Sequence, residues 1–289
     1  MTDYSKIWSK IWLVTNSASG SYSEEAVADL AGRFAAAGLA LAHVLTIPDE
    51  SAPDRSTLEA AGVDLLAIYT GDGTINGVVT GLYGWAGDVL VLPGGTQNLL
   101  AKALHGDSDV AAIVSALVES RAARVRRHLI RTSQGDALCE VLAGPGAKWS
   151  DVREAMRDGD LGGMATTLGE AIGHSTGGTP VRIVEPALGK PDGYPAVRVH
   201  PDHGRMIVDG YGAETMADYA KQGLALLRRD FREGPHDELG DHPVIVCVAN
   251  DPIELMIDGE RMTGERTERF EMHECAIEFL ATSGHSPSP

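Results

Sequence analysis

The stretch Tyr69–Leu82, YTGDGTINGVVTGL, places an aspartate between two glycines, where an apolar run gives way to a helical pattern. Glycine lets the backbone pass close to an anion and turn its N–H groups inward. Thr74 is expected at the helix N-terminus, where free N–H groups and the helix dipole favour a phosphate. Asp72 would repel that phosphate unless a magnesium ion bridges the two, or unless it removes a proton from an acceptor hydroxyl. A plain Asp-Gly turn in which Asp72 caps the helix is the structural alternative.

Two further polar segments could take part in the same chemistry. In PGGTQN, Gly94 and Gly95 permit close backbone approach, and Thr96 and Asn98 offer hydrogen-bonding groups suited to a nucleotide. Helix N-capping is the structural alternative for Gln97 and Asn98. The loop NSASGS, at 16–21, is a weaker signal because loops rich in Ser and Gly are common.

A pair of carboxylates lies near the C-terminus, in Asp258-Gly-Glu260. Two carboxylates at alternate positions beside a glycine can share one metal ion or one proton transfer. A solvated hairpin turn is the structural alternative for these residues.

The three loops of the N-terminal half follow predicted strands. Apolar runs predict strands at 11–15, 39–46, 63–70 and 88–93. Helical patterns predict helices at about 21–38, 54–61, 74–82 and 110–118, and a further helix that follows GGTQN and runs through Leu104. Ser21 and Glu24 form a capping box at the start of the first helix. Strands that alternate with helices predict a mostly parallel sheet with right-handed crossovers, whose ligands bind beyond the carboxyl ends of the strands. All three loops fall at that edge.

The pattern changes after about residue 120. Strand-like segments such as 124–132 and 137–144 then dominate, with helical stretches only near 150–157, 163–172 and 213–231. A run of strands without regular helical alternation predicts a β-rich, antiparallel second domain.

Composition limits the classes of function. The 289 residues carry a formal charge of −17, from 24 basic and 41 acidic residues, so the chain would repel nucleic-acid backbones and we expect no nucleic-acid partner. The three cysteines are widely spaced without a CxxC motif, which argues against zinc and a disulfide framework and favours the reducing cytoplasm. The N-terminus lacks a secretory leader and no apolar run approaches the roughly 20 residues of a membrane span, so any contact with the inner membrane surface is expected to be peripheral.

Four motifs resemble those of the diacylglycerol kinase catalytic-domain family, which includes bacterial lipid kinases and the sphingosine and ceramide kinases. TGDGT resembles its GGDGT loop, NSASGS its NPxSG loop, PGGTQN its PLGTxND loop and MIDGERM its DGE motif, all in the same order. The chain departs from the family at Thr70, which replaces the first glycine of GGDGT, and at Leu99, where many members have Asp.

The resemblance implies two domains and a reaction. It implies an α/β nucleotide-binding domain over 1–123 and a β-rich antiparallel sandwich that binds the acceptor over 124–281. The polar segment SGHSPSP separately predicts a disordered tail over 282–289. The implied reaction is transfer of phosphate from ATP, with Mg²⁺, to a hydroxyl of diacylglycerol or of a sphingoid- or ceramide-like lipid at a membrane surface. A kinase of a soluble substrate, in the manner of NAD kinase, and a nucleotide-binding regulator without turnover are the alternatives. A homodimer is left open.

Roles carry over to the residues that match the motifs. The implied nucleotide-binding residues are Asn16, Ser19, Gly20, Gly71, Asp72, Gly73, Thr74, Gly95, Thr96 and Asn98. The implied catalytic and metal-binding residues are Asp72, Asp258 and Glu260, with Asp258 the preferred general base.

Five arginines, at 121, 124, 126, 127 and 131, lie close to the predicted domain junction. We call them the junction arginines. In a strand over 124–131 they would divide between two faces, which disfavours a single basic patch, and we expect them to pair with acidic residues. Membrane contact is therefore expected through an apolar rim around the acceptor cleft.

Overall fold

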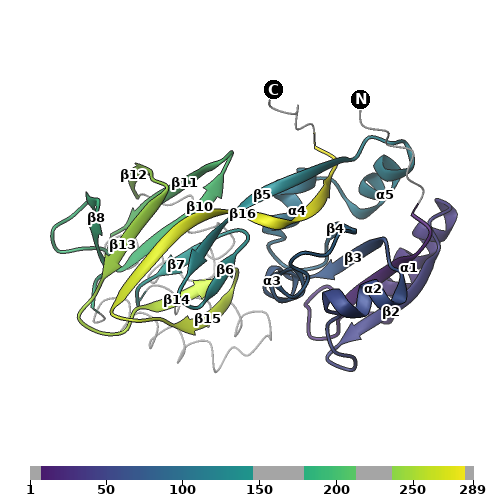
Figure 1. Ribbon diagram of the computed structural model, residues 1–289, viewed down its shortest axis with the longest axis horizontal. Coiled ribbons are helices and arrows are strands. Elements are labelled where there is room, and N and C mark those ends of the chain that lie inside the picture. Colours follow the sequence, from purple (N-terminus) through teal and green to yellow (C-terminus); the bar gives the residue numbers. More distant parts are fainter. Residues whose placement is uncertain (1–7, 146–178, 213–235, 284–289) are drawn as a thin grey trace. The chain divides into compact units, whose positions relative to one another are not determined.

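The computed structural model describes residues 8–145, 179–212 and 236–283 of the chain (Figure 1). The chain divides into unit 1, Met1–Arg127 with Glu274–Pro289, and unit 2, His128–His273. The helices predicted near 150–157, 163–172 and 213–231 lie outside the described residues.

Unit 1 contains the predicted parallel sheet. Its strands are β1 (Ile11–Asn16), β2 (Leu41–Ile47), β3 (Leu65–Thr70) and β4 (Asp88–Pro93), in the order β2-β1-β3-β4. Its helices are α1 (Glu24–Ala36), α2 (Arg55–Ala61), α3 (Asp72–Gly81), α4 (Leu99–His105) and α5 (Val110–Val118) (Figure 1). The predicted α/β class of the N-terminal half is confirmed.

The strand order determines which helices cover which face of the sheet. The chain leaves β1 towards β2 and leaves β3 towards β4, which are opposite directions across the sheet. Because such crossovers are right-handed, α1 and α3 must cover opposite faces. On the α1 face, Leu65 and Ala67 pack in one core with Phe34 of α1 and Ile113 of α5.

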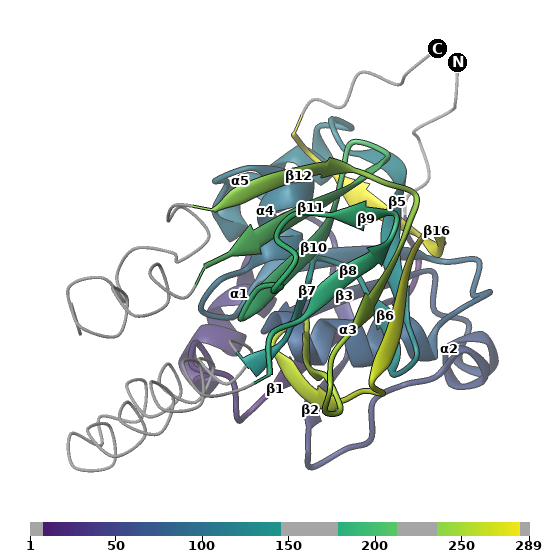
Figure 2. The ribbon, with the colours of Figure 1, turned by 90° about the vertical axis from the view of Figure 1, so that its left-hand side faces the viewer.

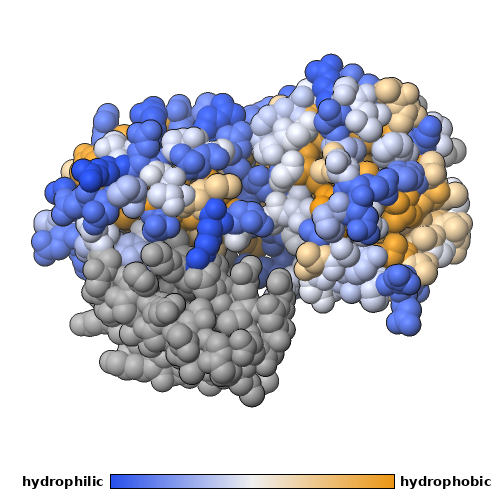
Figure 3. Space-filling model, turned by 90° about the horizontal axis from the view of Figure 1, so that it is seen from below, coloured by the Kyte–Doolittle hydropathy of each residue, from blue (hydrophilic) through white to orange (hydrophobic). Residues whose placement is uncertain are grey.

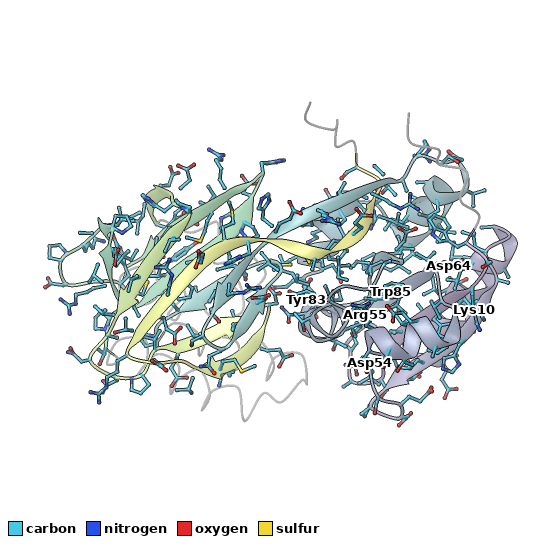
Figure 4. The ribbon with its side chains drawn as sticks, viewed as in Figure 1. Lys10, Asp54, Arg55, Asp64, Tyr83 and Trp85 are labelled. Atoms are coloured by element: carbon cyan, nitrogen blue, oxygen red, sulfur yellow. The ribbon has the colours of Figure 1, made fainter. Side chains whose placement is uncertain are left out.

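Local capping explains where the first helices begin. The N-cap of α1 is Ser23, whose hydroxyl accepts the N–H of Ala26, so the predicted capping box at Ser21 is wrong by two residues. Asp54 caps α2 in the same way, through the N–H of Thr57. At the amino ends of the strands, the carboxylate of Asp64 accepts the backbone N–H of Lys10, which aligns the start of β1 with the start of β3 (Figure 4).

The C-terminal segment returns to unit 1. The strand β16 (Thr267–Ala281) pairs in parallel with β4 through Phe279 and Val89. Beyond it, Thr282 donates its N–H to Leu104 O, and its hydroxyl lies 2.9 Å from Nδ1 of His105. His105 is buried, which lowers its pKa to about 4, and Nε2 lies 3.0 Å from the carbonyl oxygen of Val91. The second domain expected over 124–281 thus differs from unit 2 at its C-terminal end.

Unit 2 is built from two antiparallel sheets. One contains β8 (Arg182–Glu185), β9 (Ala187–Leu188), β13 (Val244–Val248) and the first part of β16, with β5 (Ala123–Thr132) and β6 (Gly135–Ala137) also in it. The other contains β7 (Val141–Ala143), β10 (Ala196–Asp202), β11 (Arg205–Tyr211), β12 (Asp237–Asp241), β14 (Glu254–Ile257) and β15 (Glu260–Thr263) (Figure 2).

Both sheets contribute to a single core. Ile183, Cys247 and Phe270 from the first sheet pack with Val199 and Leu255 from the second. Alternate residues of β7, β10, β11, β13 and β14 face this core, as expected for a sandwich. The predicted β-rich antiparallel sandwich is confirmed.

The surface of the described residues is mostly polar. The large hydrophobic residues that are most exposed are Val118, Val184 and Met262, and Figure 3 shows further apolar side chains between polar ones on one face of unit 1. No helix within 8–145, 179–212 and 236–283 has both the length and the apolar character needed to cross a bilayer.

Candidate nucleotide site

Three polar loops meet at the carboxyl edge of the unit 1 sheet. They follow β1, β3 and β4, which are neighbours in the order β1-β3-β4. The crossovers from β1 and β3 diverge, and ligands of open α/β sheets bind where the connections diverge in this way. The predicted convergence of the three loops is therefore present in the fold.

Side chains of the first loop join it to the other two. Asn16 donates from Nδ2 to the hydroxyl of Thr74 at 2.8 Å, and Ser19 donates to the carbonyl oxygen of Gly94 at 2.6 Å. Ser21 donates to the carbonyl oxygen of Gly95 at 3.3 Å. Sequence reasoning missed this role of Ser21 because its spacing from Glu24 also fits a helix cap.

The glycines of the second and third loops are required by their mutual contact. A Cβ atom on Gly95 would lie 2.6 Å from Cα of Gly71, and one on Gly94 would lie 2.5 Å from the backbone nitrogen of Thr70. Any side chain at either position would push the two loops apart. The sequence pattern predicted close approach to an anion, and close approach of backbone to backbone is a second reason for these glycines.

Asp72 connects the start of α3 to the start of α4. It is the first residue of α3, and its two carboxylate oxygens accept the N–H groups of Leu99 and Leu100, each at 3.1 Å. Asp72 therefore caps the neighbouring helix α4. The residue at the N-cap of α4, Asn98, has φ of 54° and uses Oδ1 to accept the N–H of Gly95 at 2.7 Å.

The start of α3 has no such cap. Its N-cap is Gly71, which has no side chain that could accept a hydrogen bond from the first turn. The first N–H groups of a helix point out of its N-terminus and carry partial positive charge. Gly73 and Thr74 lie in this first turn, Gly20 is exposed in the turn after β1, and Thr96 is exposed in the loop after β4.

The carboxylates of unit 2 occupy different environments. Asp258 and Gly259 form the turn between β14 and β15, with φ of 47° and 96°. Asp258 is buried, and its carboxylate accepts the N–H groups of Leu138, Cys139 and Glu140 at 2.6, 2.9 and 2.9 Å. Glu260 is exposed at the start of β15. A hairpin turn was the structural alternative for this motif, but Asp258 is anchored inside the unit.

The segment that Asp258 anchors carries a buried ion pair. Glu140 accepts a hydrogen bond from Nε of Arg198 at 2.9 Å, and Asp209 lies 3.6 Å from the same guanidinium. Tyr211 is on the same strand as Asp209, and burial raises its pKa to about 12. Sequence reasoning missed this network because Glu140 and Arg198 are 58 residues apart and no motif marks the strands that carry Arg198 and Asp209.

The residues that the structure describes offer few side chains that could hold a metal ion in the absence of a bound ligand. Among them, no three His, Cys, Asp or Glu side chains form a group that could bind a metal. Magnesium in phosphoryl-transfer sites is held by one or two carboxylates together with substrate phosphates and water. Asp72 beside the uncapped start of α3 fits that smaller requirement.

The junction arginines are engaged within the protein. Arg124 forms two hydrogen bonds with Asp88 at 2.6 and 2.8 Å, Arg131 pairs with Asp136, and Arg126 pairs with Glu274. Arg121 pairs with Glu119, and Arg127 donates to the carbonyl oxygen of Ala103. Pairing with acidic side chains, as expected from the sequence, is present for four of these five arginines.

Comparison with known proteins connects this geometry to a family. Residues 10–128 match the family model described as the diacylglycerol kinase catalytic domain. No curated protein matches the sequence. A solved structure of a diacylglycerol kinase from Bacillus anthracis is similar, with a TM-score of 0.61 and 16% identity over 96% of this chain and 98% of that one.

Two further structures from the same organism, provisionally described as a diacylglycerol kinase, show the same likeness. Each is 18% identical and covers 96% of this chain and 99% of its own, with TM-scores of 0.61 and 0.60. These likenesses cover both units and establish the shared fold. The resemblance to the diacylglycerol kinase catalytic-domain family, first inferred from four short motifs, is therefore confirmed, with residues 10–128 matching that catalytic domain.

Proposed function

We propose that this protein is an ATP-dependent lipid kinase that uses Mg²⁺ to phosphorylate a hydroxyl of diacylglycerol or of a related sphingoid- or ceramide-like lipid. The observation that carries the proposal is the joining of three loops around the uncapped start of α3, with the Asp72 carboxylate fixed beside it. Phosphoryl transfer depends mainly on positioning and charge neutralisation, and these groups provide both.

In the proposed reaction, the acceptor hydroxyl oxygen bonds to the terminal phosphorus of ATP, and the bond from that phosphorus to the bridging oxygen breaks. ADP leaves, and the hydroxyl proton passes to a carboxylate. The N–H groups at the start of α3 hold phosphate oxygens, while Asn16, Ser19, Gly95, Thr96 and Asn98 form the loops that hold the nucleotide. A bound Mg²⁺ would neutralise phosphate charge during transfer.

Asp72 is suited to orient that ion. The N–H groups of Leu99 and Leu100 each donate a hydrogen bond to one oxygen of its carboxylate. These contacts fix the direction of the carboxylate in advance, which reduces the cost of ordering it when the ion binds. Leu99 replaces the family Asp, but its backbone N–H supports Asp72.

We propose that Asp258 and Glu260 serve the acceptor side of the reaction. Asp258, the proposed general base, is held by three backbone N–H groups. Its contacts also fix the β14–β15 turn, and the exposed Glu260 is the member of the pair that a ligand reaches without rearrangement. Both are also proposed Mg²⁺ ligands.

Transfer of labelled phosphate from ATP to an extracted lipid mixture, with the product identified by mass spectrometry, tests the proposal. A labelled phospholipid that requires Mg²⁺ supports it. Label on added NAD instead would support the kinase of a soluble substrate. ATP binding without transfer to any acceptor would support the regulator.

A further inference from the structure

Among the described residues, the hydroxyl group of Thr70 has no hydrogen-bond partner, and it stands at a position where the related motif has glycine. The residue is fully buried, at 0% exposure, and Oγ1 forms no hydrogen bond with any group in the part of the chain that the structure describes. Buried hydroxyl groups almost always have a partner, because an unsatisfied one has lost its bonds to water without replacement. This atom therefore calls for a physical explanation.

The side chain of Thr70 lies on the face of the sheet that α3 covers. Leu65 and Ala67 of β3 belong to the core on the α1 face, and alternation along the strand directs Thr70 to the opposite face. Gly71 alone separates Thr70 from the first residue of α3. The start of a helix presents N–H donors and no free carbonyl oxygens, so this position supplies no acceptor for a hydroxyl proton.

Thr15 provides a comparison within the same sheet. It is also fully buried and lies near the carboxyl end of the neighbouring strand β1. Its hydroxyl lies 3.3 Å from the carbonyl oxygen of Leu45 and 3.0 Å from the hydroxyl of Thr46. Of these two threonines, the one without a partner is the one that adjoins the proposed phosphate loop.

We propose that the Thr70 hydroxyl donates a hydrogen bond to a phosphate oxygen of the nucleotide held at the start of α3. The inference rests on the proposed function, since it assumes that the loops bind a phosphate chain. An anion supplies the acceptor that the helix start lacks, and a charged acceptor makes the hydrogen bond stronger than a neutral one. A glycine at this position could not make the contact, so Thr70 would add a phosphate ligand that the GGDGT motif lacks.

The neighbouring backbone can admit the ligand to a buried hydroxyl. Gly71 follows Thr70 directly, and Gly94 and Gly95 pack against the backbone of residues 69–71. These three residues carry no side chains, so a small displacement of the loops moves little besides backbone. The contact therefore forms on binding.

The first test measures the ligand-free protein. Thr70→Val keeps the β-branched shape and removes the hydroxyl, so its urea midpoint should equal or exceed that of the wild type, because an unsatisfied polar group disappears. Thr15→Val is the matched control and should lower the midpoint, because its hydroxyl is satisfied. A loss for Thr70→Val as large as that for Thr15→Val would overturn the proposal, since the hydroxyl would then already have a partner.

The second test measures binding of ATP with Mg²⁺ by calorimetry. Thr70→Val should weaken binding by about tenfold to a hundredfold, the range for one hydrogen bond to a charged group. Thr70→Ser, which keeps a hydroxyl, and Thr15→Val should bind about as tightly as the wild type. If Thr70 had only a structural role, Thr70→Val would not keep its urea midpoint while losing affinity for ATP. Wild-type affinity in Thr70→Val would overturn the inference and leave the proposed kinase standing.

Magnesium pyrophosphate as a second probe separates the two proposals. Wild-type protein that binds pyrophosphate but not ATP would overturn the nucleotide function, and the effect of Thr70→Val on pyrophosphate would then decide the role of the hydroxyl. Wild-type protein that binds neither would overturn both.

Discussion

Replacing Asp72 should separate its capping of α4 from its role in chemistry. Asp72→Ala removes both hydrogen bonds to the N–H groups of Leu99 and Leu100. Loss of an N-cap typically costs about 1 kcal/mol, and loss of a negative charge at a helix start adds roughly 0.3–1 kcal/mol. We therefore expect the free energy of unfolding to fall by about 2 kcal/mol. Asp72→Asn keeps one acceptor oxygen and should cost about half as much.

Turnover should respond quite differently to the same two substitutions. The rate of phosphate transfer should fall by about a hundredfold or more in both variants, because neither has a carboxylate at this position to bind Mg²⁺ or to accept a proton. A stability loss of about 1–2 kcal/mol from a typical total of about 5–15 kcal/mol leaves nearly all molecules folded, so unfolding cannot explain the loss of turnover.

Urea denaturation and labelled-ATP transfer, measured on the same preparations, provide the two readouts. Asp109→Ala is the matched control, since Asp109 caps α5 through the N–H of Ala112 at 2.8 Å and lies outside the proposed site. It should lose stability and keep turnover. If Asp72→Asn retains turnover within about threefold of the wild type, Asp72 is a helix cap and the catalytic assignment is wrong.

Three further outcomes are expected. Asp258→Asn should lower turnover, and it should lower the free energy of unfolding by about 1–3 kcal/mol because one buried N–H loses its acceptor. Glu260→Gln, at the exposed neighbour, is the control and should change the free energy of unfolding by less than about 0.5 kcal/mol. Equal urea midpoints for the two variants would show that the Asp258 contacts do not contribute to stability. His105 has a pKa of about 4 when folded and about 6.5 when unfolded, so the unfolded state takes up its proton first and stability should fall by about 3 kcal/mol as the pH drops from 6.5 to 4. His105→Gln should flatten that part of the curve of urea midpoint against pH, and an unchanged curve would place the loss elsewhere. Four junction arginines are paired with acidic side chains, so co-sedimentation with anionic vesicles should be weak at low salt and should be kept or strengthened as the salt concentration rises. Tight binding that is abolished by salt would assign the membrane contact to those arginines.

The order of elements in unit 1 could be predicted because each signal was local. Apolar runs bounded by glycine and polar loops matched β1, β3 and β4 closely, and alternation with helices implied the parallel sheet that is found. The same predicted topology implies that three loops lie at the carboxyl edge of the sheet. The start of α1 was misplaced because Ser21 and Ser23 both have capping chemistry, and the sequence does not say which serine hydroxyl is engaged elsewhere.

The partners of individual side chains were decided only by the tertiary structure. Asp72 was predicted to act on its own helix or on a ligand, yet it also accepts two hydrogen bonds from α4, which begins 27 residues later. Asp258 read as part of a solvated turn or of an active site, and it is buried against a segment 118–120 residues away. Likewise, only the tertiary structure shows that the single strand β16 belongs to unit 2 up to His273 and to unit 1 from Glu274.

The sequence by itself determined which residue types stand at the ends of the strands, because short-range periodicity and turn chemistry act within a few residues. The tertiary structure decided which of those groups are satisfied, since a hydrogen bond between distant segments depends on how the strands order themselves in the sheet. Thr15 and Thr70 illustrate the difference. Both lie at or next to the carboxyl end of a buried strand, but β2 lies beside β1 and supplies partners for Thr15, while the start of α3 offers Thr70 only donors.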